Sequence, residues 1–145
     1  MSQLAMSKDE RERFLAGVHV GVLSIAAQGR APLTVPVWYT YEPGGEIRFH
    51  TGGSSRKLAL LEETGRASLC AQTETAPYQY VSVEGPVTIE GSFAPDERRS
   101  VAHRYLGQEF GDAYYDATED ESADSVTVRL SPERWLSVDY NKMLG

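Results

Sequence analysis

Several stretches of the chain alternate hydrophobic and polar residues with a period of two, the pattern of β-strands that bury one face. Between residues 33 and 41 the odd-numbered positions are apolar or aromatic, and between residues 80 and 90 valine, isoleucine and glycine alternate with polar side chains. Apolar or alternating runs at residues 18–26, 47–51, 67–72, 126–130 and 135–138 bring the expected number of strands to six or seven. Because Pro36 has no N–H to donate, its strand should lie at a sheet edge or carry a bulge.

Three other stretches begin and end with the signals of helices. Ser7 and Glu10 form a capping box for a helix over residues 8–16. Ser54 or Ser55 caps a second helix, which a glycine at position 65 closes, and a proline at position 95 begins a third helix over residues 95–106. The acidic residues 116–124 are expected to form a solvated loop.

Short strands at close intervals, joined by tight turns at residues 28–30 and 42–45, favour a mainly β fold. We expect an antiparallel sheet that curls into a small barrel, with a few peripheral helices. The second turn predicts a hairpin between the strands at residues 33–41 and 47–51. A length of 145 residues fits one domain that spans the whole chain, of which residues 1–6 are expected to be disordered.

Composition narrows the class of protein. The chain has 14 lysines and arginines against 21 aspartates and glutamates, and this net charge of -7 argues against nucleic acid as a partner. We see neither a secretion signal nor a run of 18 apolar residues, so we expect a cytoplasmic protein without a membrane span. Cys70 is the only cysteine and reads as a small buried hydrophobe, and the three histidines have no metal-binding spacing, so no metal site is expected.

The clearest chemical signal is the run Thr51-Gly52-Gly53-Ser54-Ser55-Arg56-Lys57, where a strand ends and a helix begins. Backbone N–H groups at a helix N-terminus carry about half a positive charge. The serine hydroxyls can donate, and Arg56 and Lys57 add full charges, so the run suits an anion. It does not match the Walker pattern of nucleotide hydrolases. An ordinary capped helix with surface cations explains the same residues, although cations in the first turn oppose the helix dipole.

A second candidate is the segment Pro36-Val37-Trp38-Tyr39, which places the Trp38 ring on the strand face opposite the apolar row. A large planar ring there can pack on a partner chain or form the wall of a flat ligand's site, while ordinary core or dimer packing explains an aromatic pair as well. No nucleophile motif and no carboxylate pair spaced for acid–base catalysis occurs, so catalytic residues stay unassigned. Any chemistry is therefore expected to come from a cofactor.

The segments VGVLSIAAQGRAPLTVPVWYTYEPGGEIRFHT, SSRKLALLEETGRASLC and PYQYVSVEGPV follow an expected N-terminal helix in that order. Together they resemble the pyridoxamine 5'-phosphate oxidase-like flavin and deazaflavin oxidoreductases, above all the small deazaflavin-dependent branch called FDOR-B, over residues 11–140. The resemblance implies a split antiparallel β-barrel. It also implies a homodimer with two cofactor sites at the interface, each holding coenzyme F420 or FMN.

The resemblance further implies which residues bind the cofactor. Ser55, Arg56 and Lys57 look like the family's phosphate clamp, with Thr51 also facing the cofactor. The strand along the ring system would consist of Pro36, Val37, Trp38 and Tyr39. Trp135 and the tail Tyr140-Asn141-Lys142 would reach the site of the second subunit. The chain lacks the C-terminal extension that carries the pyridoxal phosphate-binding arginine of pyridoxamine phosphate oxidases, which counts against vitamin B6 oxidation.

The function that the resemblance implies is hydride transfer between F420 and a small conjugated or planar acceptor, such as an enone, a quinone or a tetrapyrrole-like molecule. Two alternatives stay open: an FMN-binding oxidase or reductase of the same family, and a cofactor-binding protein without catalytic turnover. The anion-binding run does not separate F420 from FMN, because both carry a phosphate on the ribityl arm. Neither the acceptor nor the preferred polyglutamate tail follows from the sequence.

Overall fold

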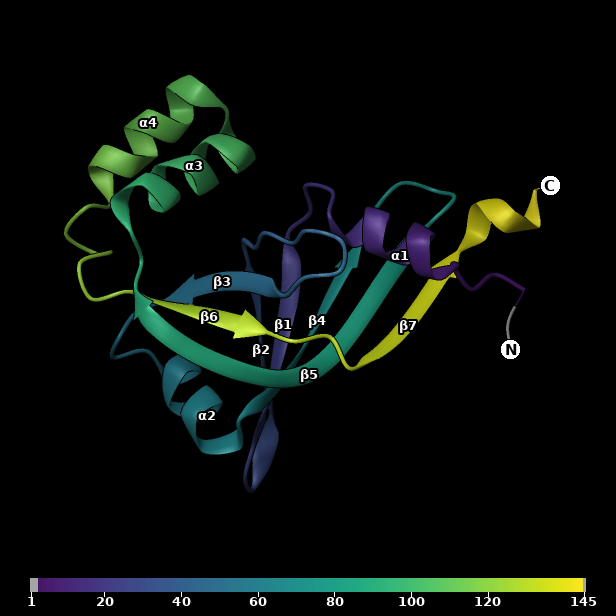
Figure 1. Ribbon diagram of the computed structural model, residues 1–145, viewed down its shortest axis with the longest axis horizontal. Coiled ribbons are helices and arrows are strands. Elements are labelled where there is room, and N and C mark those ends of the chain that lie inside the picture. The colour runs from purple at the N-terminus through teal and green to yellow at the C-terminus, as the bar shows by residue number, and fades with distance from the viewer. Residues whose placement is uncertain (1–2, 145) are drawn as a thin grey trace.

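The computed structural model describes residues 3–144, which form a curved antiparallel sheet with helices at its margins (Figure 1). The strands are β1 (Gly21–Ala27), β2 (Arg30–Val37), β3 (Ile47–Thr51), β4 (Arg66–Gln72), β5 (Gln79–Ser92), β6 (Val126–Leu130) and β7 (Arg134–Asp139). The helices are α1 (Lys8–Leu15), α2 (Arg56–Thr64), α3 (Pro95–Leu106) and α4 (Gln108–Ala117), with a short 3-10 helix η1 (Tyr140–Met143).

The sheet is open rather than closed. Its strands follow the order β2-β1-β4-β5-β6-β3, and β7 pairs with β5 beside this path. The long strand β5 joins the two parts of the sheet, because its first half pairs with β4 and β7 and its second half with β6. It bends strongly between the halves (Figure 1). The predicted fold class, a split antiparallel β-barrel with peripheral helices, is therefore confirmed, and β2 with Pro36 lies at the expected edge.

The predicted hairpin across residues 42–45 is wrong. β2 ends at Val37, and the segment that follows meets β3 at a single bridge between Thr40 and Arg48. β3 instead pairs along its length with β6. The physical reason is that Tyr39 and Tyr41 turn into the core, where the Tyr39 hydroxyl donates to the carbonyl of Leu15 at 2.7 Å, and this draws the chain away from the sheet edge.

The core gathers apolar residues of β1, β3 and β4 around Val81 and Val83 of β5, while Val87 and Ile89, which were also predicted to point inward, are only partly buried against it. Burying each such side chain contributes roughly 1.5–3 kcal/mol. Gly85 marks a close crossing, because a Cβ there would lie 1.8 Å from the carbonyl oxygen of Ser131. Strand β5 can bend past the β6–β7 connection only because this residue lacks a side chain.

The local helix signals are largely confirmed. Ser7 and Glu10 form both hydrogen bonds of the capping box, Ser55 is the N-cap of α2, and Gly65 ends that helix in the left-handed conformation. Of the expected disordered N-terminus, residues 1–2 lie outside the described residues. For residues 3–6 the expectation is wrong, because Met6 is buried, its N–H donates to Ser137, and the carbonyl of Leu4 accepts from Asp139.

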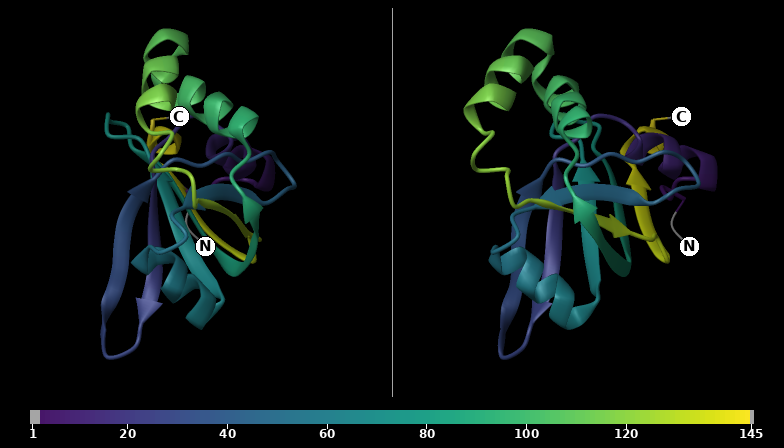
Figure 2. Two further views of the ribbon diagram at one scale, coloured as in Figure 1. Left: turned by 90° about the vertical axis from the view of Figure 1, so that its left-hand side faces the viewer. Right: turned by 60° about the vertical axis from the view of Figure 1, so that its left-hand side comes forward.

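Helices α3 and α4 form an antiparallel pair above one end of the sheet, opposite the β1–β2 turn (Figure 2). Helix α3 is fixed at both ends. Near its start Glu97 accepts two hydrogen bonds from Arg48 of β3, and near its end Arg104 donates to the carbonyls of Ala16 and Gly17. The sequence reasoning missed α4, which packs closely on α3 because Gly111 leaves room for His103. This helix pair forms one wall of the cavity described next.

Candidate functional site

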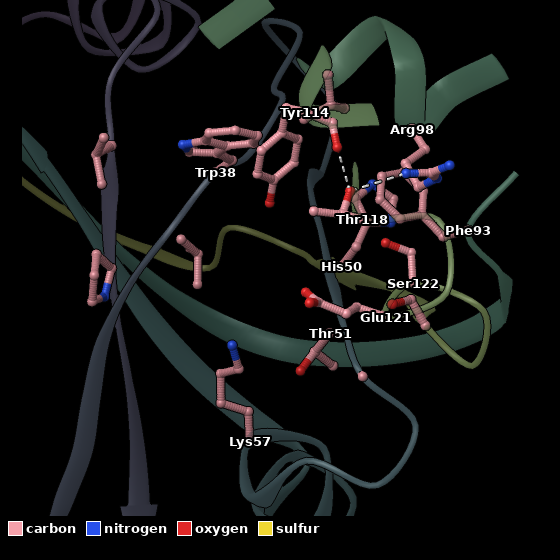
Figure 3. A pocket seen from close by; sticks show the side chains of 16 residues that line it. Trp38, His50, Thr51, Lys57, Phe93, Arg98, Tyr114, Thr118, Glu121 and Ser122 are labelled. Atoms are coloured by element: carbon pink, nitrogen blue, oxygen red, sulfur yellow. Dashed lines mark hydrogen bonds between the residues drawn. The ribbon is translucent and has the colours of Figure 1, made fainter. Parts of the chain in front are cut away.

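A cavity of about 570 Å³ opens where β2 and β3 end, between the start of α2 and the α3–α4 pair (Figure 3). Lys57 reaches into it from one side, and Trp38 and Tyr114 lie across from it on the other (Figure 3). The lining residues are Val20, Pro36, Val37, Trp38, His50, Thr51, Gly52, Lys57, Phe93, Arg98, Val101, Tyr114, Thr118, Glu121, Ser122 and Ser125. Of the nine predicted cofactor-binding residues, this cavity brings together five: Pro36, Val37, Trp38, Thr51 and Lys57.

One side of the cavity, which we call the cationic end, consists of Thr51, Gly52 and Lys57. Among residues 3–144, no carboxylate lies within 4.0 Å of the Lys57 ammonium group, so its charge is available to a ligand. Helix α2 begins beside it, and the first backbone N–H groups of a helix attract anions. The cationic end is thus suited to a phosphate group.

Two other residues of the predicted clamp have different roles. The Ser55 hydroxyl accepts the N–H of Leu58 at 3.1 Å and lies 2.8 Å from the Thr51 hydroxyl, so it caps α2 and orients Thr51. Arg56 is exposed on the outside of the first turn and does not line the cavity. Consecutive helix residues point about 100° apart, so the first turn can aim Lys57 or Arg56 inward but not both.

The acidic segment after α4 forms the part of the cavity lining that lies beside the chain just before α2. We expected a simple solvated loop at residues 116–124, and this interpretation is incomplete, because Thr118, Glu121 and Ser122 line the cavity. The loop packs so closely on Gly53 that a Cβ there would lie 2.6 Å from the carbonyl oxygen of Asp124. A sequence gives little warning of this contact, since the two segments are about 70 residues apart.

The opposite side, which we call the aromatic wall, consists of Trp38 and Tyr114 with Tyr105 behind them. The rings of Trp38 and Tyr105 stack with centroids 4.9 Å apart at an interplanar angle of 4°. Tyr114 approaches Trp38 at 5.2 Å with a tilt of 51°, and its hydroxyl points into the cavity (Figure 3). Trp38 lines the cavity instead of joining the core cluster, and the wall offers a planar apolar surface.

Tyr39 does not reach the cavity. Its side chain is only 1% exposed, its hydroxyl donates to Leu15, and burial raises its pKa. Tyr39 lies beyond the end of β2, and its contacts with Leu15 and the core turn it away from the cavity that Trp38 lines.

The far wall of the cavity contains two buried polar side chains. The His50 ring stacks on Phe93 at 3.4 Å, its Nδ1 lies 3.0 Å from the Thr127 hydroxyl, and burial lowers its pKa to about 4, so the imidazole is neutral at pH 7. Arg98 donates to the carbonyl of Tyr115 and the hydroxyl of Thr118 at the end of α4. The sequence reasoning missed both, although His50 stands directly before Thr51.

Trp135 lies away from this cavity, on β7. Its ring meets Tyr41 edge to face at 6.2 Å, and the Arg11 guanidinium lies 4.6 Å from its centre. In the tail, the Lys142 ammonium binds Glu10 at 3.0 Å. Both contacts are within one chain, so a role for these residues in the site of a second subunit stays a prediction.

Among the described residues, metal binding and thiol chemistry have little support. Within residues 3–144 no three histidine, cysteine, aspartate or glutamate side chains are grouped as metal ligands. The Cys70 thiol is half-buried, and burial raises its pKa, which disfavours the reactive thiolate. None of the described helices is long and apolar enough to cross a membrane. A flat ligand with an anionic arm is what the cavity suits best.

The open, bent antiparallel sheet is that of a split β-barrel. The family model of pyridoxamine 5'-phosphate oxidase matches residues 7–139, so the chain belongs to that family. A search of curated protein sequences finds no significant match.

Solved structures share the fold. The chain is similar to the conserved hypothetical protein Rv2991 from Mycobacterium tuberculosis, with a TM-score of 0.77 and 25% identity over 100% of this chain and 92% of that one. A protein titled F420 reductase aligns with a TM-score of 0.69 and 18% identity over 86% of this chain and 94% of that one. A FAD-binding protein from Mesorhizobium loti aligns with a TM-score of 0.64 and 19% identity over 92% of each chain.

Proposed function

We propose that the protein is an oxidoreductase that uses coenzyme F420 to reduce a small planar, conjugated acceptor. The observation that carries the proposal is the pairing, across one cavity, of an ammonium group without an ion partner among residues 3–144 and a flat aromatic surface. A deazaflavin has the matching shape, since it joins a planar ring to a phosphate-bearing arm. The similar fold of a protein titled F420 reductase supports the same choice.

The residues present fit such a group. Lys57, the Thr51 hydroxyl and the N–H groups at the start of α2 would hold the phosphate, and Pro36, Val37 and Trp38 would lie along the ring. The cavity volume of about 570 Å³ falls within the usual range of small-molecule sites, roughly 300–1,000 Å³. Arg56 and Tyr39 are not part of this assignment, because their side chains point elsewhere.

When bound, reduced F420 would supply a hydride, two electrons and one proton, to the acceptor, and water or a nearby hydroxyl would supply the second proton. The chain's own contribution is positioning and the exclusion of water. Val20, Val101 and Trp38 give the cavity apolar walls. The Tyr114 hydroxyl on the aromatic wall points into the cavity and bears a proton, and neutral His50 adds no charge at the far wall (Figure 3). No residue is assigned as catalytic.

We also propose a homodimer, with cofactor sites at its interface. Pro36, Val22, Cys70, Ser82 and Leu136 stand directly opposite one another in neighbouring strands, so they form one row across the outer face of the sheet. This row is mostly apolar, Leu136 is 60% exposed, and the row ends at Pro36 on the cavity edge. A second copy of the chain in the cytoplasm would cover it. Light scattering that gives a monomer at micromolar concentration would contradict this.

Two tests decide between F420 and the alternatives. The absorbance spectrum of the purified protein, with fluorescence titrations of F420 and FMN, identifies the cofactor. Stopped-flow mixing of the protein and reduced F420 with menadione and an enone then measures turnover. Oxidation no faster than without enzyme, together with tightly copurified FMN, would favour an FMN enzyme, for which the FAD-binding structural relative is a precedent for flavin binding on this fold. Tight binding of F420 without oxidation by any acceptor would instead indicate a cofactor-binding protein.

A further inference from the structure

The orientation of the Trp38 ring depends on its neighbours rather than on hydrogen bonds of its own. Within residues 3–144 the indole N–H has no hydrogen-bond partner, so the ring plane is set by its contacts with Tyr105 and Tyr114. Of the two, only the contact with Tyr105 is nearly parallel, at 4°. Tyr114 is more than a third exposed and is carried by α4. Tyr105 is thus the residue that can define the plane.

The Tyr105 hydroxyl is bound to the backbone that carries Trp38. It accepts the N–H of Tyr39 at 3.0 Å, and it lies 2.7 Å from the carbonyl oxygen of His19 and 2.9 Å from that of Tyr39, to which it can donate. Tyr39 follows Trp38 directly, and His19 lies just before β1. One hydroxyl therefore ties the end of α3 to the segment before β1 and to the residue that follows Trp38.

We propose that Tyr105 is a positioning residue: its stacked ring and bound hydroxyl hold the Trp38 indole in a single plane, and this plane sets how closely an acceptor approaches the ring bound along Pro36 to Trp38. The effect on acceptor approach rests on the proposed function. The effect of Tyr105 on the orientation of the Trp38 ring does not, because it concerns this chain alone. Hydride transfer needs reacting atoms at about 3–3.5 Å, so a tilted wall costs rate more than affinity.

The substitution Tyr105→Phe separates the two contributions of the residue. It keeps a ring able to stack and removes only the hydroxyl. Helix α3 should stay docked, because Arg104 still binds the carbonyls of Ala16 and Gly17 and Glu97 still binds Arg48. Tyr115→Phe is a matched control on the same helix pair, since the Tyr115 hydroxyl has no hydrogen bond to any of the described residues and its ring contacts the guanidinium groups of Arg98 and Arg99, at 3.8 and 4.2 Å from the ring centre.

The first measurement needs no cofactor. The chain has two tryptophans, so Trp135→Phe leaves Trp38 as the single indole. In that background we expect Tyr105→Phe to lower the fluorescence anisotropy of Trp38 and to increase its quenching by acrylamide, while Tyr115→Phe changes neither. Circular dichroism establishes that each variant is folded. Unchanged anisotropy and quenching in a folded Tyr105→Phe protein would overturn the proposal.

The second measurement concerns turnover. With a phosphate-bearing cofactor bound, Tyr105→Phe should lower kcat by about threefold to tenfold and change the cofactor Kd by less than about twofold. In a Trp38→Ala background the same substitution should have no further effect on kcat, because the group that it positions is gone. Equal, additive losses in both backgrounds would overturn the positioning role. If the fluorescence changes as expected but no acceptor oxidises bound F420, the proposed function fails and the link between Tyr105 and Trp38 stands.

Discussion

The cationic end and the aromatic wall of the cavity are built in different ways. The cationic end comes from seven consecutive residues, 51–57, in which a strand stops, two glycines turn the chain and a helix begins. The aromatic wall combines a residue just beyond β2 with residues of α3 and α4 that lie more than 60 positions further along the chain. The first is fixed by local geometry, and the second exists only once the helix pair has docked. Because the cationic end would hold the cofactor phosphate, a change there should alter cofactor affinity. Because the wall would set how closely the acceptor approaches, a change there should alter turnover.

The largest effect is expected at the cationic end. Lys57→Ala removes a charge-assisted contact worth roughly 1.5–3 kcal/mol, so the cofactor Kd should rise by about tenfold to hundredfold. Arg56→Ala is the matched control: it removes a cation of the same helix turn that does not line the cavity, and the Kd should change by less than about threefold. Fluorescence titration of both variants with F420 and FMN measures the difference. Equal losses would show that the exposed arginine turns inward when an anion is present.

A smaller and different effect is expected at the aromatic wall. Trp38→Ala removes the plane without touching the phosphate-binding residues, so kcat should fall by about tenfold while the cofactor Kd rises by less than about threefold. Single-turnover oxidation of bound, reduced F420 by menadione separates the two quantities. A rise in Kd as large as that of Lys57→Ala would remove the distinction between the two regions.

How far the sequence predicts each region follows from this difference. Period-2 alternation placed β2 and β5, and Ser7, Ser55 and Gly65 marked helix ends, because these signals act over a few residues. The anion-binding run was found for the same reason. Which of Lys57 and Arg56 points inward was not predicted, since it depends on where the first turn of α2 meets the ends of the strands.

The partner of β3 and the cavity residues that follow α3 could not be predicted from local signals, because they depend on contacts between distant parts of the chain. The predicted hairpin failed because burial of Tyr39 and Tyr41 outweighs local turn preference, and β3 found its partner in β6, some 80 residues later. Tyr114 and Glu121 belong to the cavity only through the docking of α3 and the close contact of Gly53 with Asp124. No spacing along the chain announces such contacts.

The far wall gives a pH-dependent test that the cationic end does not affect. The pKa of His50 falls from its ordinary 6.5 to about 4 because the ring is buried. Between these values the unfolded chain binds more protons than the folded one, so stability should fall as the pH drops from 6.5 to 4, by roughly 1–3 kcal/mol in all. His50→Gln keeps a polar group beside Thr127 and does not titrate. Urea unfolding at pH 7, 5.5 and 4.5 should show a steeper loss for the parent than for this variant, and parallel curves would exclude His50 as the cause.

The smallest effect tests whether Ser55 belongs to the fold or to the ligand. As the N-cap of α2 it accepts the N–H of Leu58, and removing such a cap costs about 1 kcal/mol of stability. Its hydroxyl is already engaged by that N–H and by Thr51, so it has little left to offer a phosphate. Ser55→Ala should therefore lower the melting temperature by a few degrees, about 4 °C at this chain length. The cofactor Kd should rise far less than in Lys57→Ala. Thermal unfolding and the same fluorescence titration measure both quantities on one protein sample. A Kd that rises as much as in Lys57→Ala, with an unchanged melting temperature, would place the serine hydroxyl on the ligand and extend the cationic end by one residue.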